Sequence, residues 1–358
     1  MKSYFEFIRY CIDGKQAVPA SMQYVDWEKM FLFMQQQALL GVGFHGIERL
    51  KKEGVDIPKP LLLKWYSVSE KIRLQNELLN IRAVEIVRLL DNKEGVKSCI
   101  LKGQGNATMY PNPYMRTSGD IDIWADGGRG NLMTLVRRYY PKTHLRYHHV
   151  DFPVFKDVMV EVHFMPSLMN NPVYNKRLNK WFESGKEQQF GNLVKLPNGE
   201  SIPIPTIDFN IVYQLSHMMH HFFDEGIGLR QMMDYYFILK NSDGQTLDKA
   251  ALDKKLKYLG LYRFAGAVMY IMQEVFGLEK ERIIAPVDVE RGKTLMEEIL
   301  KGGNFGKYSG LTEHSTGVKY FLKIRRNMRF VREYPAEALC EPLFRTWHFF
   351  WRLSHKRS

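Results

Sequence analysis

Apolar residues recur at helical spacing along the first 95 residues of the chain. The stretch DWEKMFLFMQQQALLGVGFHGIERL has this spacing and shows no strand-like alternation of apolar and polar positions. A second stretch begins after Pro60 and ends at Gly95, which stands where a glycine commonly caps a helix. Its predicted apolar stripe comprises Ile72, Leu78, Leu79, Ile81, Ile86 and Leu90. We therefore expect an N-terminal helical region over residues 1–95.

The pattern changes at Val96, where short apolar runs are separated by glycine and proline. The runs VKSCILKG, SGDIDIWAD, LRYHHVDFPVF and DVMVEVHF are typical of strands, whereas QGNATMY and NLMTLVRRYYP favour helices. From Thr206 onwards the helical spacing returns. We predict an α+β fold with a small mixed core over residues 96–205. This core is flanked by the region 1–95 and by a C-terminal helical region over residues 206–358.

Composition and charge narrow the class of protein. The chain has 358 residues, 45% hydrophobic and 25% charged, which is typical of a globular protein with a sizeable core. Its formal charge of +12 favours an anionic partner such as a nucleotide, although many basic proteins bind no polyanion. Three widely spaced cysteines argue against a structural zinc site. Neither a signal peptide nor a run of roughly 20 apolar residues is present, so we expect a cytoplasmic protein without a membrane span.

The run GDIDIW places two carboxylates two residues apart in an apolar strand. Residues two apart in a strand point to one face, so Asp120 and Asp122 project together while Ile121 and Ile123 face the core. Like charges this close raise the pKa of one of them unless a cation neutralises them. Mg²⁺ with oxygen ligands is the obvious neutraliser, with Mn²⁺ as an alternative. A solvated edge strand that happens to carry two aspartates explains the same pattern.

A second strand supplies a third carboxylate. In DVMVEVHF the alternation puts Val158, Val160 and Val162 on one face. Glu161 and His163 therefore share the other face. A carboxylate on a neighbouring strand would complete a two-metal site. We expect His163 to orient Glu161 or to contact the substrate.

Residues ahead of the acidic pair are candidates for nucleotide binding. Gly103 ends a strand and leads into a predicted helix, so the backbone there can approach a phosphate. Arg116 lies four residues before Asp120, in a loop from which its guanidinium would clamp phosphate oxygens. Lys102 stands at the strand end, immediately before the glycine. An ordinary turn and surface ion pairs account for these residues equally well.

Taken together, these motifs resemble the nucleotidyltransferase superfamily typified by DNA polymerase beta. That superfamily has a glycine motif after one strand, an Asp-x-Asp pair on the next and a third acidic residue on a later strand. The string LKG…YPNPYMRTSGDIDIW…VEVHF is more similar to its bacterial branch, the nucleotidyltransferase family 5 proteins. The resemblance covers Ile100 to Phe164 and extends less specifically through HMMHHFFDEGIGLRQMMDYYF. It implies a polymerase-beta-like core, an NTP substrate and two bound Mg²⁺ ions.

The resemblance assigns roles position by position. Asp120, Asp122 and Glu161 become catalytic metal ligands, and Gly103 becomes the phosphate-approach glycine. The chain departs from the superfamily in that the usual Gly-Ser or Gly-Gly step is Gly103-Gln104. The gap from Gly103 to Asp120 is also longer than in many members. Both departures bear on the mode of triphosphate binding rather than on the metal site.

A downstream helix carries a histidine cluster. His217 and His221 are four residues apart and share a helix face, a spacing that can ligate a transition metal. No HExxH pattern accompanies them, so we favour a polar contact with the catalytic cleft, together with Arg230 and Asp234. His163, His217, His221 and Arg230 are thus the candidate substrate contacts. A metal bound by the histidine pair stays an alternative.

The predicted activity is metal-dependent transfer of a nucleoside monophosphate from an NTP to an acceptor hydroxyl, with release of pyrophosphate. The acceptor stays open between a small molecule, a protein and RNA. Basic residues near the C-terminus could bind a nucleic-acid backbone, but a solvated helix face is the simpler interpretation. Two alternatives remain. One is a catalytically inert nucleotide-binding or regulatory module of the same fold, against which the three carboxylates argue; the other is a tRNA-modifying nucleotidyltransferase of a toxin system.

Overall fold

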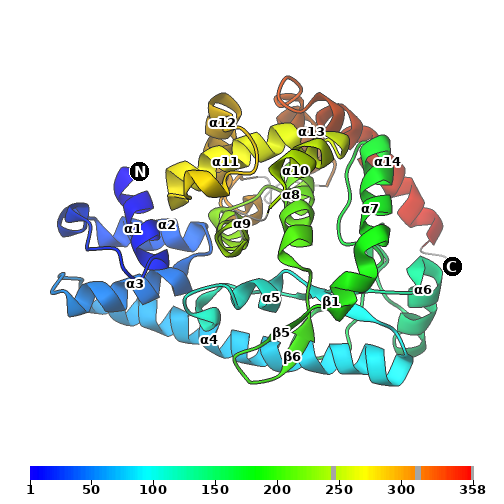
Figure 1. The fold of residues 1–358 in the computed structure, drawn as a ribbon, viewed down its shortest axis with the longest axis horizontal. Coiled ribbons are helices and arrows are strands. Elements are labelled where there is room, and N and C mark those ends of the chain that lie inside the picture. Colours follow the sequence, from blue (N-terminus) through cyan, green and yellow to red (C-terminus); the bar gives the residue numbers. More distant parts are fainter. Residues whose placement is uncertain (243–246, 311–315, 356–358) are drawn as a thin grey trace.

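The computed structural model describes residues 1–242, 247–310 and 316–355. Every strand among these residues lies between Ser98 and Pro203, with helices before and after. Figure 1 shows the strands in the lower half of the molecule, framed by helices. The α+β class predicted from the sequence, a small mixed sheet with flanking helices, is therefore confirmed. The region boundaries at residues 95 and 205 stay predictions.

The N-terminal helices lead into one long helix that runs along the lower edge of Figure 1. They are α1 (Lys2–Ile12), the 3-10 helix η1 (Ala20–Tyr24), α2 (Trp27–Gln36), α3 (Leu40–Lys52) and α4 (Lys59–Arg88). α4 continues as a short π-helix, η2 (Leu89–Lys93), and the chain turns at Gly95, whose φ is 65°. This left-handed conformation is the one expected of a capping glycine. Ile81 is 49% exposed, so the predicted apolar stripe is wrong at that position.

Four short strands form the main sheet in the order β1-β2-β4-β3. They are β1 (Ser98–Leu101), β2 (Ile121–Ala125), β3 (His149–Asp151) and β4 (Val160–His163). β2 and β4 are parallel, whereas β1 with β2 and β3 with β4 are antiparallel. A second sheet pairs β5 (Leu193–Lys195) with β6 (Ser201–Pro203). The predicted elements do not include this hairpin, although Asn198-Gly199 between its strands is a typical hairpin turn.

Helices connect the strands. They are α5 (Gly103–Ala107) and the 3-10 helix η3 (Pro113–Met115) before β2, α6 (Gly128–Tyr139) after it, and α7 (Pro172–Gly191) after β4. α5 and α6 confirm the helices predicted in QGNATMY and NLMTLVRRYYP. α7 has no counterpart in the prediction, although its start carries a clear signal. The side chain of Asn171 accepts from the N–H groups of Val173 and Tyr174, and Pro172 takes the first helical position.

The C-terminal part is helical, as predicted. Its elements are α8 (Ile207–Asp224), α9 (Leu229–Asn241), α10 (Lys249–Tyr258), α11 (Tyr262–Phe276), η4 (Lys280–Arg282), α12 (Val289–Gly302), η5 (Asn304–Gly306), α13 (Thr316–Met328) and α14 (Pro335–His355). Across the described ranges, none of the helices combines the length and apolar character needed to cross a membrane.

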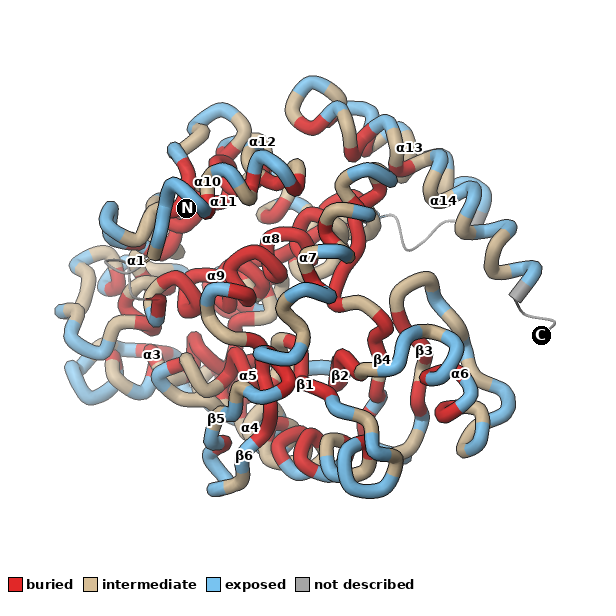
Figure 2. The backbone as a smooth tube through the Cα atoms, turned by 45° about the vertical axis from the view of Figure 1, so that its right-hand side comes forward, coloured by how far each residue is buried: buried red, intermediate tan, exposed pale blue. Residues whose placement is uncertain are grey.

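The two faces of the main sheet have different covers. Ile121, Ile123 and the valines of β4 pack with apolar residues of α4, α6 and β6. Trp124 belongs to a larger cluster that includes residues of α7 and α8, and its ring stacks on Phe209 at 5.8 Å. Figure 2 shows the central strands and α8 largely in red, as buried. Because side chains alternate along β2, Asp122 lies on the face of Trp124, under the helices.

Candidate active site

The parallel pairing of β2 with β4 places two predicted carboxylates side by side. Asp122 is the register partner of Glu161, and Trp124 is that of His163. The valines of β4 are buried on the opposite face, so the predicted alternation of DVMVEVHF is confirmed. One oxygen each from Asp122 and Glu161 and a ring nitrogen of His163 lie within 4.8 Å of one another. The structure thus brings these three side chains together.

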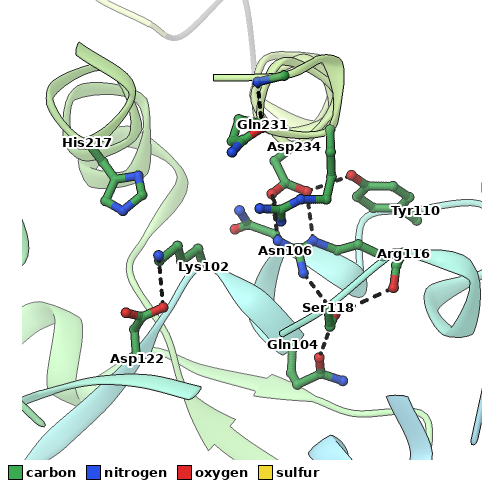
Figure 3. Close-up of polar contacts among 12 residues, drawn as sticks. Lys102, Gln104, Asn106, Tyr110, Arg116, Ser118, Asp122, His217, Gln231 and Asp234 are labelled. Atoms are coloured by element: carbon green, nitrogen blue, oxygen red, sulfur yellow. Dashed lines mark hydrogen bonds and ion pairs between the residues drawn. The ribbon is translucent and has the colours of Figure 1, made fainter. Parts of the chain in front are cut away.

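Asp122 is buried and both of its oxygens have cationic partners. Oδ2 lies 2.9 Å from Lys102 Nζ, as Figure 3 shows, and Oδ1 lies 2.9 Å from His163 Nε2. Burial alone would raise the pKa of Asp122, but Lys102 and then His163 hold it well below its usual range. The neutralising charge that the sequence argument assigned to a metal ion is therefore supplied here by the chain itself.

Lys102 reaches Asp122 because the backbone turns sharply at the end of β1. Lys102 and Gly103 have φ values of 47° and 48°, a left-handed region that residues other than glycine rarely adopt. Burial tends to lower the pKa of Lys102, but Asp122 and Asp120 outweigh it and raise that pKa. A Cβ added at Gly103 would meet no atom within 4 Å. Its positive φ, rather than crowding, is what favours glycine there.

His163 links the two carboxylates. Its Nε2 is 2.9 Å from Asp122 Oδ1 and 3.4 Å from Glu161 Oε2. Burial would lower the pKa of His163, but these two contacts raise it to about 9, so the imidazole is protonated at neutral pH. Burial raises the pKa of Glu161 above its usual range. A metal ion bound by Asp122 and Glu161 would therefore compete with the protonated His163 for the same carboxylate oxygens.

Asp120 lies outside this trio. It is exposed and stands one residue before β2 begins. Within the described ranges, the groups of three converging ligand atoms do not include it. Its charge nevertheless acts on Lys102 and Glu161 and raises the pKa of both. The assignment of Asp120 as a metal ligand stays a prediction.

Arg116 is buried against α9 and does not overhang the site. Its side chain is 2% exposed, and Nε and Nη2 donate to the two carboxylate oxygens of Asp234 at 2.8 and 2.7 Å. The hydroxyl of Tyr110 donates to Asp234 at 2.6 Å, and Arg116 Nη1 donates to Ser118 Oγ at 2.9 Å (Figure 3). The sequence-based placement in a loop facing phosphate is therefore corrected. A role of Arg116 in nucleotide binding stays a prediction.

Buried amides of α4 extend this network beneath the loop. Asn76 Nδ2 donates to the carbonyl of Arg116 at 2.8 Å, and Asn76 Oδ1 accepts from the hydroxyl of Ser118 at 3.0 Å. Gln104 Nε2 donates to Asn80 Oδ1 at 2.6 Å. Asn76 and Asn80 lie on the buried face of α4 with Leu79 and Ala83, where a polar side chain normally needs a hydrogen-bond partner. They were therefore the available sequence signal for this network. The network fixes the segment between β1 and β2.

Histidines at the start of β3 and on α8 surround the trio. His149 Nδ1 lies 3.4 Å from Glu161 Oε2, and the rings of His148 and His220 are 5.8 Å apart. Burial, followed by the charge of His163, lowers the pKa of His149 to about 2. Burial also lowers the pKa of His220 to about 4. These imidazoles are therefore neutral at neutral pH, which leaves them able to act as ligands.

The histidine pair predicted on α8 lies on the helical side of the site. The Nε2 atoms of His217 and His221 are 3.0 Å apart, and His221 Nδ1 is 2.7 Å from Glu225 Oε1. Figure 3 shows the ring of His217 on the side of the site opposite Asp122, with Lys102 between them. Burial, followed by the charge of Lys102, lowers the pKa of His217 well below its usual range. The predicted contacts of His217 and His221 with a substrate stay predictions.

Arg230 belongs to the network around Asp234. Its Nη1 is 3.8 Å from Asp234 Oδ2, and its guanidinium lies over the ring of Phe305, 5.3 Å from the ring centre. Burial and the charge of Arg116 lower the pKa of Arg230. The structure thus places Arg230 beside Arg116, and its predicted contact with a substrate stays a prediction.

One acidic residue of this sheet face is absent from the sequence-based prediction. Asp151 on β3 is a register partner of Glu161, and its Oδ1 is 3.7 Å from His149 Nε2. His149, Asp151 and Glu161 form a second group of ligand atoms within 4.8 Å of one another. The signal was present in HHVDF, where His149 and Asp151 flank the buried Val150 and so share a face.

A small mixed sheet whose parallel central strands present converging carboxylates beneath a helical cover fits the core of a nucleotidyltransferase. The family model described as uncharacterised nucleotidyltransferase matches residues 23–277, and the chain belongs to this family. No curated protein and no solved structure matches the chain. The matched segment includes the whole main sheet and ends just after α11, so α12 to α14 lie outside it.

Proposed function

We propose that this protein transfers a nucleoside monophosphate from an NTP to an acceptor hydroxyl and releases pyrophosphate. The observation that carries the proposal is the convergence of Asp122, Glu161 and His163, whose ligand atoms lie within 4.8 Å. These residues stand on the paired central strands of a chain that belongs to a nucleotidyltransferase family. Nucleotidyl transfer needs a focus of negative ligands that can hold a cation next to the phosphates.

The donor set fits a divalent cation. Two carboxylates and one imidazole offer oxygen and nitrogen ligands on one side of the sheet, and Asp120 stands one residue outside the strand. Mg²⁺ favours an all-oxygen set, whereas Mn²⁺ also accepts imidazole. Asp122 and Glu161 would hold the cation, with Asp120 as the third carboxylate. When bound, such an ion neutralises phosphate charge and lowers the pKa of the attacking hydroxyl.

Residues at the end of β1 would contact the phosphates of the NTP. Lys102 brings an ammonium group to within 2.9 Å of Asp122, beside the position proposed for the triphosphate. Gly103 has no atom within 4 Å of the place its Cβ would take, which leaves room for a phosphate to approach the backbone. His163 would give up the proton that it shares with Asp122 and Glu161 when a cation is bound. The hydrogen-bond network around Arg116 and Asp234 would hold the segment between β1 and β2, which begins with Lys102 and Gly103.

A labelling experiment tests this function. A cell extract is separated into protein, RNA and small-molecule fractions. The protein is then incubated with each fraction and each α-³²P-labelled NTP, in the presence of Mg²⁺ or Mn²⁺. We expect transfer from at least one NTP, lost in Asp122→Asn and Glu161→Gln. Asp56→Asn, an exposed change between α3 and α4, is the matched control and should retain transfer. No transfer with any NTP and fraction, or full transfer by Asp122→Asn, would contradict the proposal.

A specific observation favours one second candidate, a nucleotide-binding module without turnover. Both oxygens of Asp122 already have cationic partners, Lys102 and His163, so this carboxylate is satisfied without a metal ion. A module of this kind would bind an NTP with Lys102 and would not require a divalent cation. Calorimetry with a non-hydrolysable NTP separates the candidates, because binding that is equally tight with EDTA and with Mn²⁺ supports the module.

A further inference from the structure

The carboxylates of the sheet form a row of three. Asp122 and Asp151 are both register partners of Glu161, from opposite sides, so the row crosses β2, β4 and β3. His163 and His149 form a parallel row one pleat away, because they pair with each other in the same register. Glu161 therefore lies between the two aspartates of its row, with His163 two residues along its own strand and His149 beside it on β3.

Both histidines approach the same oxygen of Glu161. On one side His163 Nε2 is 3.4 Å from Glu161 Oε2, and on the other His149 Nδ1 is 3.4 Å from the same oxygen. Asp151 Oδ1 lies 3.7 Å from the second nitrogen of His149. Ligand atoms that share one ion at metal–ligand distances near 2.1 Å lie roughly 3 to 3.5 Å apart. His149 turns Nδ1 towards Glu161 and Nε2 towards Asp151, so binding of one ion by all three residues requires rotation of the imidazole or movement of a carboxylate.

We propose that His149 and Asp151, together with Glu161, are the ligands of a second divalent cation beside the one at Asp122 and Glu161. The first position is that of Asp122 and His163. The inference rests on the proposed function, since it concerns the same site, and it adds ligands that the family motif does not supply. Each position pairs an imidazole with carboxylates, a set that suits Mn²⁺, Co²⁺ or Zn²⁺ better than Mg²⁺.

Metal counting tests the second position without using activity. The full chain, freed of metal with EDTA, is titrated with Co²⁺ by calorimetry and by its visible absorption. Asp151→Asn and His149→Gln should each bind one ion fewer than wild type, whereas Glu161→Gln should bind two fewer. Asp56→Asn should bind as many as wild type. Each variant is compared with the wild type by the difference in bound ions per chain. An additional ion bound elsewhere, for example by His217 and His221, contributes equally to both counts and cancels.

Electron paramagnetic resonance of Mn²⁺ gives a second readout that is independent of activity. Two ions bridged by one carboxylate couple magnetically, so the fully loaded wild type should give an exchange-coupled spectrum. Asp151→Asn should give the spectrum of isolated Mn²⁺, with circular dichroism confirming that the variant is folded. An uncoupled wild-type spectrum, or unchanged ion counts in Asp151→Asn and His149→Gln, overturns the second position.

The outcomes separate this inference from the proposed function. A wild-type chain that transfers label but binds a single ion at the site overturns the second position alone. A chain that binds two coupled ions and transfers no label overturns the proposed function alone. A chain that binds no divalent cation at Asp122 and Glu161 overturns both.

Discussion

Two clusters of charged residues lie on neighbouring parts of this fold. They differ in how completely their carboxylates are neutralised by cationic and hydrogen-bonding partners. Around Asp234, one guanidinium donates to both carboxylate oxygens and a tyrosine hydroxyl adds a third hydrogen bond. Around Glu161, three carboxylates face one ammonium group, one protonated imidazole and several neutral histidines. In the first cluster both oxygens of Asp234 accept hydrogen bonds. In the second cluster, carboxylate oxygens and imidazole nitrogens converge in positions from which they could bind a cation. A saturated buried ion pair ties elements together, and an unsaturated one can accept a ligand.

The largest difference between the clusters should appear in catalysis. Glu161→Gln should reduce nucleotidyl transfer by at least about a thousand-fold, since it removes a ligand of the cation that offsets phosphate charge. The variant should melt no lower than wild type, because burial already raises the pKa of Glu161 and so disfavours its charged form. Rates of label transfer and melting curves check both parts. A variant with full transfer would place Glu161 among structural residues.

Arg116→Ala should act mainly on folding. Without Arg116, the buried Asp234 keeps only the hydroxyl of Tyr110 and the more distant Arg230 as partners. Breaking a buried ion pair in this way typically costs about 3 to 5 kcal/mol of the free energy of unfolding. The double variant Arg116→Ala with Asp234→Asn should recover part of this loss. Urea unfolding of both variants measures it. Wild-type stability with weakened NTP binding would instead restore Arg116 as a phosphate clamp.

Acid should destabilise the protein through its buried histidines. The folded-state pKa values of His149 and His220, about 2 and about 4, lie below the value near 6.5 of an unfolded chain. The unfolded state thus binds more protons in this range, so stability is complete above pH 6.5 and falls as the pH drops towards 4. Each histidine should contribute roughly 1 to 3 kcal/mol. Melting temperatures between pH 7.5 and 4.5 should fall less steeply in His220→Gln.

His163 should respond in the opposite sense. Its pKa is raised to about 9, so its contribution is complete below pH 6.5 and is lost as the pH rises through 9. His163→Gln should therefore flatten the alkaline side of the stability profile by about 1 to 3 kcal/mol, while the acid side keeps its slope. Melting curves from pH 6.5 to 10 measure this change. An unchanged alkaline side would show that the imidazole is not shared between Asp122 and Glu161.

The smallest expected effect is that of Tyr110→Phe. It removes one hydrogen bond to a charged carboxylate that Arg116 continues to satisfy, so the free energy of unfolding should fall by about 1.5 kcal/mol. Label transfer should stay within about twofold of wild type, because the cluster around Asp234 is structural in this view. A much larger loss of transfer than of stability would link that cluster to catalysis.

Much of the fold could be read from local pattern. The alternation in DVMVEVHF predicted the buried valines of β4 and the shared face of Glu161 and His163. The same rule placed Asp122 opposite Ile121 and Ile123. Asp120 escaped the rule because β2 begins after it, so no strand partner holds its backbone. For β5 and β6 the available signal was the turn Asn198-Gly199 rather than any alternation in the strands.

The sequence by itself determined which side chains share a face, because the two-residue period of a strand is a property of the local backbone. Only the tertiary structure decided how the charges are paired. Lys102 meets Asp122 through a left-handed turn, Arg116 meets Asp234 across 118 positions, and Asp151 meets Glu161 through strand register. Such pairings depend on distances through space and on burial, which strengthens each interaction and penalises each unpaired charge. The neighbours that set these quantities come from distant parts of the chain.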